Sequence, residues 1–257
     1  MHSRYEADQV PGLTEVERGR SEALHTVLVA TNVKPYLYPP ANTPLPLCYA
    51  FYLFGDVQGR TVLDLGCGSG ENVRPLLARG ANVIGIDLSQ DLIEWARQRL
   101  ALTDQRDDAR LLVGSAYDVP LPDGGVDAIL CASLLHHLNI PRAMAEMKRL
   151  LKPGGVAIVK EPVRFSKTMA AIRPLFAAKE DISEDEHPLT TEEYATVKEG
   201  WIASGERAFR LPMIPLIDKL FSEKTALKFW GLDRGLLSIR PLEHFATVRV
   251  LKLQKPA

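Results

Sequence analysis

The run VLDLGCGSG, residues 62–70, carries the strongest structural signal in the chain. A short apolar stretch broken by one acid is typical of a buried strand, and here it enters a turn with three glycines in five residues. Apolar residues at helical spacing follow from Glu71 to Ala78 and stop before Gly80, a residue that commonly ends helices. A strand, glycine turn and helix in this order let a ligand lie directly against the backbone.

Strands and helices continue to alternate after this turn. We predict strands at 81–87, 110–114, 126–131 and 156–160, a helix at 90–102 capped by Ser89, a helix starting at Pro141, and a turn at 152–155. Strands separated by crossover helices form a parallel sheet with helices on both faces. The sequence therefore predicts an α/β fold with a doubly wound, mostly parallel sheet.

The two flanks are less regular. Five prolines lie between residues 35 and 46, and the alternation fades after Glu161 until residues 245–253 alternate again as a strand. We expect a single domain, 1–257, made of an N-terminal cap (1–56), a ligand-binding core (57–160), a lid or acceptor region (161–242) and a closing strand (243–257).

Composition excludes several classes of protein. The 257 residues are 46% hydrophobic and 25% charged, with a formal net charge of −1, which argues against a general nucleic-acid binder. The three scattered cysteines predict no disulfide framework. The first residues contain no signal-peptide run, and the apolar run 45–54 is too short for a membrane helix. We expect a cytoplasmic protein without stable membrane insertion.

The residues around the glycine turn narrow the class of ligand. The turn has no lysine that could hold phosphates, and Glu71 stands where a dinucleotide fingerprint needs its third glycine. Carboxylates there disfavour a pyrophosphate but tolerate an ammonium or sulfonium. Asp87, at the end of the next strand, can accept hydrogen bonds from ribose hydroxyls, although it could instead be a solvated acid or a helix cap. The pattern favours an adenosine-bearing ligand without phosphates.

The runs VLDLGCGSG, VIGID, LPDGGVDAILCASLLHHL and LLKPGG, in this order, resemble the class I S-adenosylmethionine-dependent methyltransferases. They are most similar to the small-molecule branch that includes quinone-biosynthesis enzymes, and the resemblance covers about residues 62–160. It implies a Rossmann-like sheet with an antiparallel closing strand, S-adenosylmethionine as cofactor and S-adenosylhomocysteine as product. The family's sixth strand is not placed by the sequence.

The resemblance also implies cofactor-binding residues. The methionine end of the cofactor would be lined by Asp64, Gly66, Cys67, Gly68 and Gly70, and the methionine group would be underlain by Cys131, Ala132 and Ser133. Asp87 would hold the ribose. Leu88 would pack on the adenine, and the adenine edge would be bordered by Ser115 and Ala116. Many relatives carry an aspartate where this chain has Ser115.

Three residues are candidates for catalysis. His136, one of two adjacent histidines after the fourth strand, is the preferred base, although packing explains it as well. Glu161 leaves the fifth strand at the edge where α/β sheets bind ligands. His187 lies in an acidic run, which is usually a solvated face. No His or Cys spacing indicates a metal site.

The expected reaction is in-line transfer of a methyl group to a small, apolar or aromatic organic acceptor. The sequence CASL at 131–134 lacks the Asn/Asp-Pro-Pro-Tyr/Phe pattern of amino methyltransferases that act on nucleobases, and the flanks are rich in aromatic residues. Two alternatives stay open: a regulatory protein that binds the cofactor without turnover, or another transfer from the same sulfonium. The acceptor, the methylated atom and the oligomeric state are also left open.

Overall fold

The computed structural model describes residues 34–101, 109–165, 187–214, 217, 220, 221 and 223–256. The chain divides into two units, Met1–Lys34 and Pro35–Ala257, and every strand and every helix after α2 (Lys34–Leu37) belongs to the second. The first 33 residues of the expected N-terminal cap lie outside the described residues. The single-domain organisation therefore stays a prediction.

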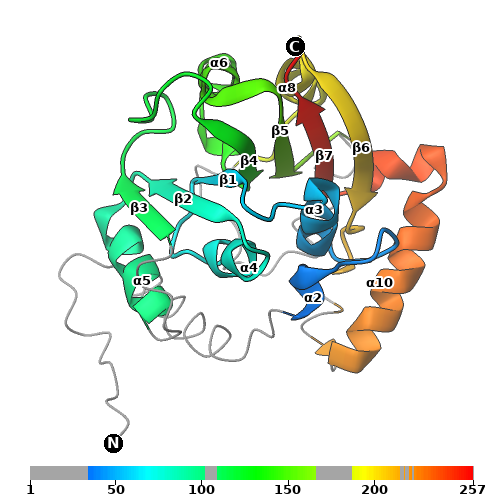
Figure 1. Cartoon of the computed structure of the whole chain (residues 1–257). Coiled ribbons are helices and arrows are strands. Elements are labelled where there is room, and N and C mark those ends of the chain that lie inside the picture. The colour runs from blue at the N-terminus through cyan, green and yellow to red at the C-terminus, as the bar shows by residue number, and fades with distance from the viewer. Residues whose placement is uncertain are drawn as a thin grey trace, which may run out of the picture. The chain divides into compact units, whose positions relative to one another are not determined.

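The described strands form one sheet in the order β3-β2-β1-β4-β5-β7-β6 (Figure 1). Their bounds are β1 Thr61–Leu65, β2 Asn82–Asp87, β3 Ala109–Val113, β4 Val126–Ala132, β5 Leu151–Pro162, β6 Ile202–Phe209 and β7 Val248–Gln254. Strands β1 to β5 pair in parallel, whereas β7 is antiparallel to both of its neighbours, β5 and β6. The predicted α/β sheet with an antiparallel closing strand is confirmed.

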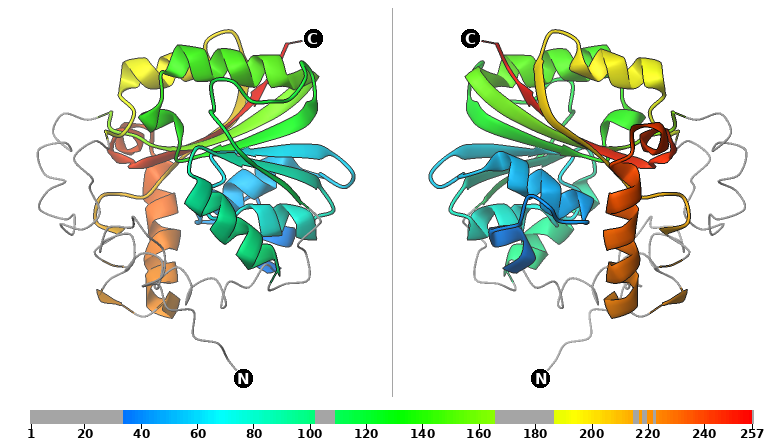
Figure 2. Two further views of the ribbon diagram at one scale, coloured as in Figure 1. Left: turned by 90° about the vertical axis from the view of Figure 1, so that its left-hand side faces the viewer. Right: turned by 90° about the vertical axis from the view of Figure 1, so that its right-hand side faces the viewer.

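Helices cover both faces of the sheet (Figure 2). One face carries α3 (Pro46–Phe54), α4 (Val73–Ala78) and α5 (Gln90–Ala101), and the other carries α6 (Ile140–Leu150) and α8 (Thr191–Lys198). The remaining elements are η2 (Leu135–His137), α10 (Glu223–Leu237) and η4 (Arg240–Phe245). Each buried aliphatic side chain in these two layers stabilises the fold by about 1.5–3 kcal/mol.

Helix α3 corrects the expectation of an irregular N-terminal flank. The apolar run that is too short to span a membrane forms a helix that packs against β5 and β7. Phe51 and Ala50 are fully buried, and the helix is apolar almost all round, as a helix in a protein interior must be. Among the described residues, no helix is long and apolar enough to cross a membrane.

Several element boundaries differ from the prediction. Helix α4 begins at Val73 rather than Glu71, and β7 begins at Val248 because Phe245 lies in η4. The predicted turn at 152–155 lies inside β5, where the register against β4 shifts between Val126 and Ala128. Gly154 takes a positive φ of 71° there, so the chain makes a bulge without leaving the strand.

Strand β6 lies inside the segment expected to form the lid. Its first five residues are exposed, and Gly205 has a φ of 60° where the register against β7 shifts. Hydrophobic alternation marks a strand that is buried on one face. An edge strand with most of its length in solvent has no such pattern, so the sequence did not reveal β6.

Candidate functional site

The glycine turn lies at the carboxyl end of β1, where the strand order reverses between β1 and β4. The backbone N–H groups of Gly66 and Cys67 both donate to the carbonyl of Ile86, at 2.9 and 3.0 Å, and tie the turn to β2. In open α/β sheets, ligands bind outside the carboxyl ends of the strands at this point of reversal.

Two positions in the turn favour glycine for different structural reasons. At Gly70, with a φ of 79°, a Cβ atom would lie 2.9 Å from the Cβ of Ala96, so glycine lets α5 pack against the turn. At Gly68, with a φ of 51°, a Cβ would have no neighbour within 4 Å. The backbone at Gly68 therefore faces open space, as a surface that receives a ligand would.

Asp87 connects the turn to the start of α5. One carboxylate oxygen accepts the N–H of Gly68 at 2.9 Å, and the other accepts the N–H of Ser89 at 2.9 Å. Asp87 thus acts partly as the helix cap considered for it, together with Ser89, whose hydroxyl accepts the N–H of Leu92. Each carboxylate oxygen has a second lone pair, so Asp87 can still accept further hydrogen bonds.

Asp64 is a fully buried acid in β1. Neither of its carboxylate oxygens has a hydrogen-bond partner in the described part of the chain. Burial is the main cause that raises the pKa of Asp64 to about 7; the Asn72 side chain works against this rise, and the nearby carboxylates of Asp87 and Glu71 add to it. A buried polar group without a partner is costly, so the position suits a ligand that brings a cationic hydrogen-bond donor.

Leu88 and the loop after β3 form the next part of this edge. Leu88 is 78% exposed, an unusual state for a large apolar residue and one that suits stacking against a flat ligand. Ser115 and Ala116 are half-buried, and the Ser115 hydroxyl accepts the N–H of Tyr117 at 3.1 Å. The side chain of Ser115 therefore stabilises its own turn.

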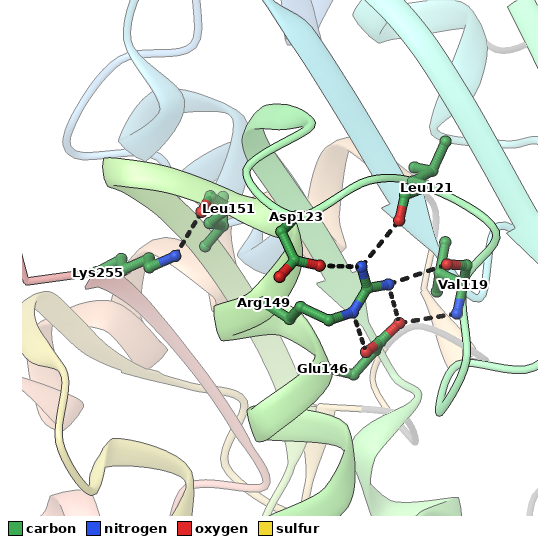
Figure 3. A network of polar contacts seen from close by, with 7 residues as sticks. All are labelled: Val119, Leu121, Asp123, Glu146, Arg149, Leu151 and Lys255. Carbon is green, nitrogen blue, oxygen red and sulfur yellow. Dashed lines mark hydrogen bonds and ion pairs between the residues drawn. The ribbon is translucent and has the colours of Figure 1, made fainter.

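An ion-pair network holds the far end of this loop on α6 (Figure 3). The Arg149 guanidinium donates to both oxygens of Glu146, to Asp123, and to the carbonyls of Val119 and Leu121, at 2.7–3.0 Å. Glu146 also accepts the N–H of Val119 at 2.8 Å. The hydrogen bonds from Arg149 hold the pKa of the Glu146 carboxyl below its usual range.

The residues after β4 reach the same edge. Cys131 is buried, Ala132 is half-buried, and Ser133 is exposed with a φ of 57°. The Ser133 hydroxyl accepts a hydrogen bond from Lys160 Nζ at 2.7 Å, and its N–H donates to the Lys160 carbonyl at 2.7 Å. Cys67 and Cys131 are free thiols and both are buried, as expected for small interior side chains.

His136 and Glu161, predicted separately, form a buried pair. His136 Nδ1 lies 2.7 Å from one carboxylate oxygen of Glu161, and the side chains are 5% and 0% exposed. The other oxygen of Glu161 accepts the N–H groups of Leu134 and Leu135, at 2.8 and 2.9 Å. Glu161 therefore connects the end of β5 to the turn after β4 and orients the imidazole.

His187 is not brought to this pair. Its side chain is 57% exposed and contacts Glu193 of α8 at 3.4 Å. Lys160, in contrast, lies at the carboxyl edge and was not a candidate from the sequence. Like Glu161, Lys160 is a charged residue near the carboxyl end of β5, so its position in the sequence indicates it equally well. Among the described residues, no group of three His, Cys, Asp or Glu could hold a metal ion.

The sheet order defines a Rossmann-like protein, and the glycine turn and the acids beside it form a candidate ligand site at the carboxyl edge. Residues 63–159 match the family model described as a methyltransferase domain. A demethylmenaquinone methyltransferase of Symbiobacterium thermophilum is 35% identical over 107 residues, which are 40% of this chain and 43% of that protein. The chain spans less than half the length of the curated relatives it matches.

Solved structures share the fold at low sequence identity. A geranyl diphosphate methyltransferase, solved with geranyl diphosphate and sinefungin, has a TM-score of 0.59 and 20% identity over 80% of this chain and 77% of its own. The (4+2)-cyclase SpnF has a TM-score of 0.58 and 18% identity over 96% of this chain and 99% of its own. Because one is a methyltransferase and the other a cyclase, the fold does not select the chemistry.

Proposed function

We propose that this chain is an S-adenosylmethionine-dependent methyltransferase that acts on a small, apolar or aromatic organic acceptor. The observation that carries the proposal is the buried, unpartnered carboxylate of Asp64 beside the open backbone of Gly68. This cofactor carries an ammonium group, a ribose diol and no phosphate, so Asp64, Asp87 and Leu88 fit its three parts. The quinone and geranyl substrates in the names of the relatives support a small acceptor.

When bound, S-adenosylmethionine supplies a methyl carbon already activated by its sulfonium. The chain then has to orient the acceptor and exclude water, because no protein nucleophile is needed. We assign Asp64 to the ammonium, Asp87 to the ribose hydroxyls, and the exposed face of Leu88 to the adenine. Gly66, Cys67, Gly68 and Gly70 line the methionine end, with Ala132 and Ser133 beneath it and Ala116 at the adenine edge.

We assign His136 as the base that takes a proton from the acceptor. One oxygen of Glu161 accepts two backbone N–H groups and the other faces His136 Nδ1, so the ring is oriented with Nδ1–H toward the carboxylate. Nε2 is then the basic nitrogen. Glu161 acts through His136, so it is a positioning residue. We expect general-base catalysis by this pair to raise the rate of methyl transfer about 10²-fold.

Binding is the first test. Calorimetric titration with S-adenosylmethionine and S-adenosylhomocysteine should give dissociation constants below millimolar for both ligands. Absence of binding would remove the cofactor and, with it, the proposed function. Binding without transfer of an isotope-labelled methyl group to any compound of a metabolite extract would favour the regulatory alternative.

Variants of the buried pair test the base. Glu161→Gln keeps an oxygen for the backbone N–H groups but presents an amide N–H₂ to Nδ1, which moves the imidazole proton to Nε2. We expect kcat to fall about 10²-fold in both Glu161→Gln and His136→Ala, with cofactor affinity unchanged, whereas the exposed His244→Ala changes neither. An equal loss of affinity and turnover would make His136 a packing residue.

A further inference from the structure

The turn after β4, residues 134–139, carries His136 and is fixed at its start by β5. One oxygen of Glu161 accepts the N–H groups of Leu134 and Leu135. The other oxygen lies 2.7 Å from His136 Nδ1. These contacts orient the imidazole, and they act on the first three residues of the turn.

The end of the same turn is held by Tyr117, which comes from the loop after β3. The N–H of Asn139 donates to the Tyr117 hydroxyl at 2.6 Å. Asn139 also caps α6, because its side-chain oxygen accepts the N–H of Arg142 at 3.2 Å. The Arg142 guanidinium lies over the Tyr117 ring, 4.6 Å from its centroid, and restrains the ring. His136 therefore lies in a turn whose two ends are held by two different elements.

Tyr117 is firmly connected to the residues assigned to the adenine edge. It directly follows Ala116, and its N–H donates to the Ser115 hydroxyl at 3.1 Å. The N–H of Asp118 donates to the Ser115 carbonyl at 3.3 Å and closes a tight turn. The network around Arg149 holds the far end of the same loop on α6 (Figure 3). A displacement of Ala116 is therefore passed on to Tyr117.

The Tyr117 hydroxyl does more than the packing of its ring requires. The ring packs against the core cluster together with Leu134 and Leu138, and a phenylalanine would keep that packing. Helix α6 already has the Asn139 side chain as its cap. A hydrogen bond at an exposed backbone N–H adds little to stability, so its main effect is on the position of the turn.

We propose that Tyr117 is a positioning residue that links the adenine edge of the cofactor site to the turn that carries His136. This rests on the proposed function and deepens it. A ligand at the adenine edge restrains Ala116, and the Tyr117 hydroxyl passes this restraint to Asn139. The proposed base is then held at both ends of its turn once the cofactor site is filled, which favours binding of the cofactor before the acceptor.

Amide hydrogen exchange, measured by mass spectrometry, tests the link without a known acceptor. Saturating wild-type protein with S-adenosylhomocysteine should slow exchange about 5-fold in peptides that cover residues 115–118 and 134–139. Tyr117→Phe should keep the slowing at 115–118 and lose it at 134–139, because the hydroxyl that joins the two segments is missing.

A matched variant and two further measurements separate positioning from packing. Tyr52→Phe removes the hydroxyl of an exposed tyrosine on α3 and should behave as wild type in each assay. Tyr117→Phe should keep the melting temperature and bind S-adenosylhomocysteine within about 2-fold of wild type. With an acceptor found by isotope labelling, its kcat should fall about 10-fold, because the base is less well placed.

The outcomes separate this link from the proposed function. Equal slowing at 134–139 in wild type and Tyr117→Phe would overturn the link, because the ligand would then act on the turn directly. Slowing at 115–118 alone in wild type would overturn it as well. A lower melting temperature with faster exchange throughout α6 would make Tyr117 a packing residue. If wild-type protein does not bind S-adenosylhomocysteine, neither segment slows, and the proposed function fails together with the link.

Discussion

At the scale of single residues, Asp64 makes the structure sensitive to pH. Its folded-state pKa of about 7 lies above the ordinary value of 3.8 because the carboxyl is buried near two other acids. Between these two values the folded state binds more protons than the unfolded state. Stability therefore falls as the pH rises from about 4 to about 7, since a raised carboxyl pKa favours the folded, protonated form at low pH.

Asp64→Asn should remove this dependence. We expect the free energy of unfolding of the wild type, relative to Asp64→Asn, to fall by on the order of 3 kcal/mol between pH 4 and pH 7.5. Urea denaturation at a series of pH values measures the difference, and the comparison cancels groups that both proteins share. A constant difference across this range would contradict the raised pKa.

Cofactor binding should show the opposite dependence on pH from stability. An ammonium near Asp64 favours the ionised carboxylate, so binding releases a proton and affinity for S-adenosylhomocysteine should rise with pH until about 7. Asp64→Asn should bind more weakly and without this rise.

At the scale of elements, the network around Arg149 holds the loop between β3 and β4 on α6 (Figure 3). Arg149 satisfies Glu146 and two loop carbonyls at once, and the Glu146 side chain is only 9% exposed. Removing the guanidinium leaves a mostly buried carboxylate without its cation. Leaving a buried charge without its partner lowers the free energy of unfolding strongly, whereas exposed ion pairs contribute little to it.

Arg149→Ala should therefore lower the free energy of unfolding by about 3 kcal/mol. Glu94→Ala is the matched control, because its pair with Arg97 is exposed on both sides and should cost less than about 0.5 kcal/mol. Chemical denaturation measures both variants. Similar small losses in the two would mean that the network does not hold the loop.

At the scale of the whole molecule, the segment after β6 is attached to the sheet through Asp233. This residue of α10 is buried, and its two carboxylate oxygens accept the N–H groups of Arg210 and Leu211, at 3.0 and 2.7 Å. Among the side chains of α10 that the structure describes, Trp230 and Leu237 are the buried apolar ones, and they pack in two small clusters apart from the sheet core. The polar attachment therefore matters more than it would in the sheet core.

Asp233→Asn replaces one acceptor with a donor that faces a backbone N–H. We expect a loss of about 1–3 kcal/mol that is local, so amide hydrogen exchange should accelerate in α10 and at the end of β6 while β1 and β4 keep their protection. Unchanged exchange in α10 would show that apolar packing alone holds the helix. Uniform acceleration would show that α10 unfolds together with the sheet.

Local sequence patterns were sufficient to predict the parallel half of the sheet. Buried strands such as β1 and β4 read as apolar runs, helix α5 begins after Ser89 as its cap predicts, and Gly80 follows the end of α4 with a φ of 76°. These signals lie within a few residues of each other, so the sequence alone contains them. The exposed edge strand β6 and the buried helix α3 lacked such signals.

The sequence by itself determined the α/β class, the glycine turn, and the acids and histidines at strand ends. Only the tertiary structure decided which of those side chains meet. His136 and Glu161 are 25 residues apart and pair at 2.7 Å because β4 and β5 are parallel neighbours, whereas His187 lies with α8. The packing of neighbouring strands also buries Asp64 and brings Lys160 to Ser133. Solvent access and the distances between side chains depend on this packing, and no local sequence pattern encodes them.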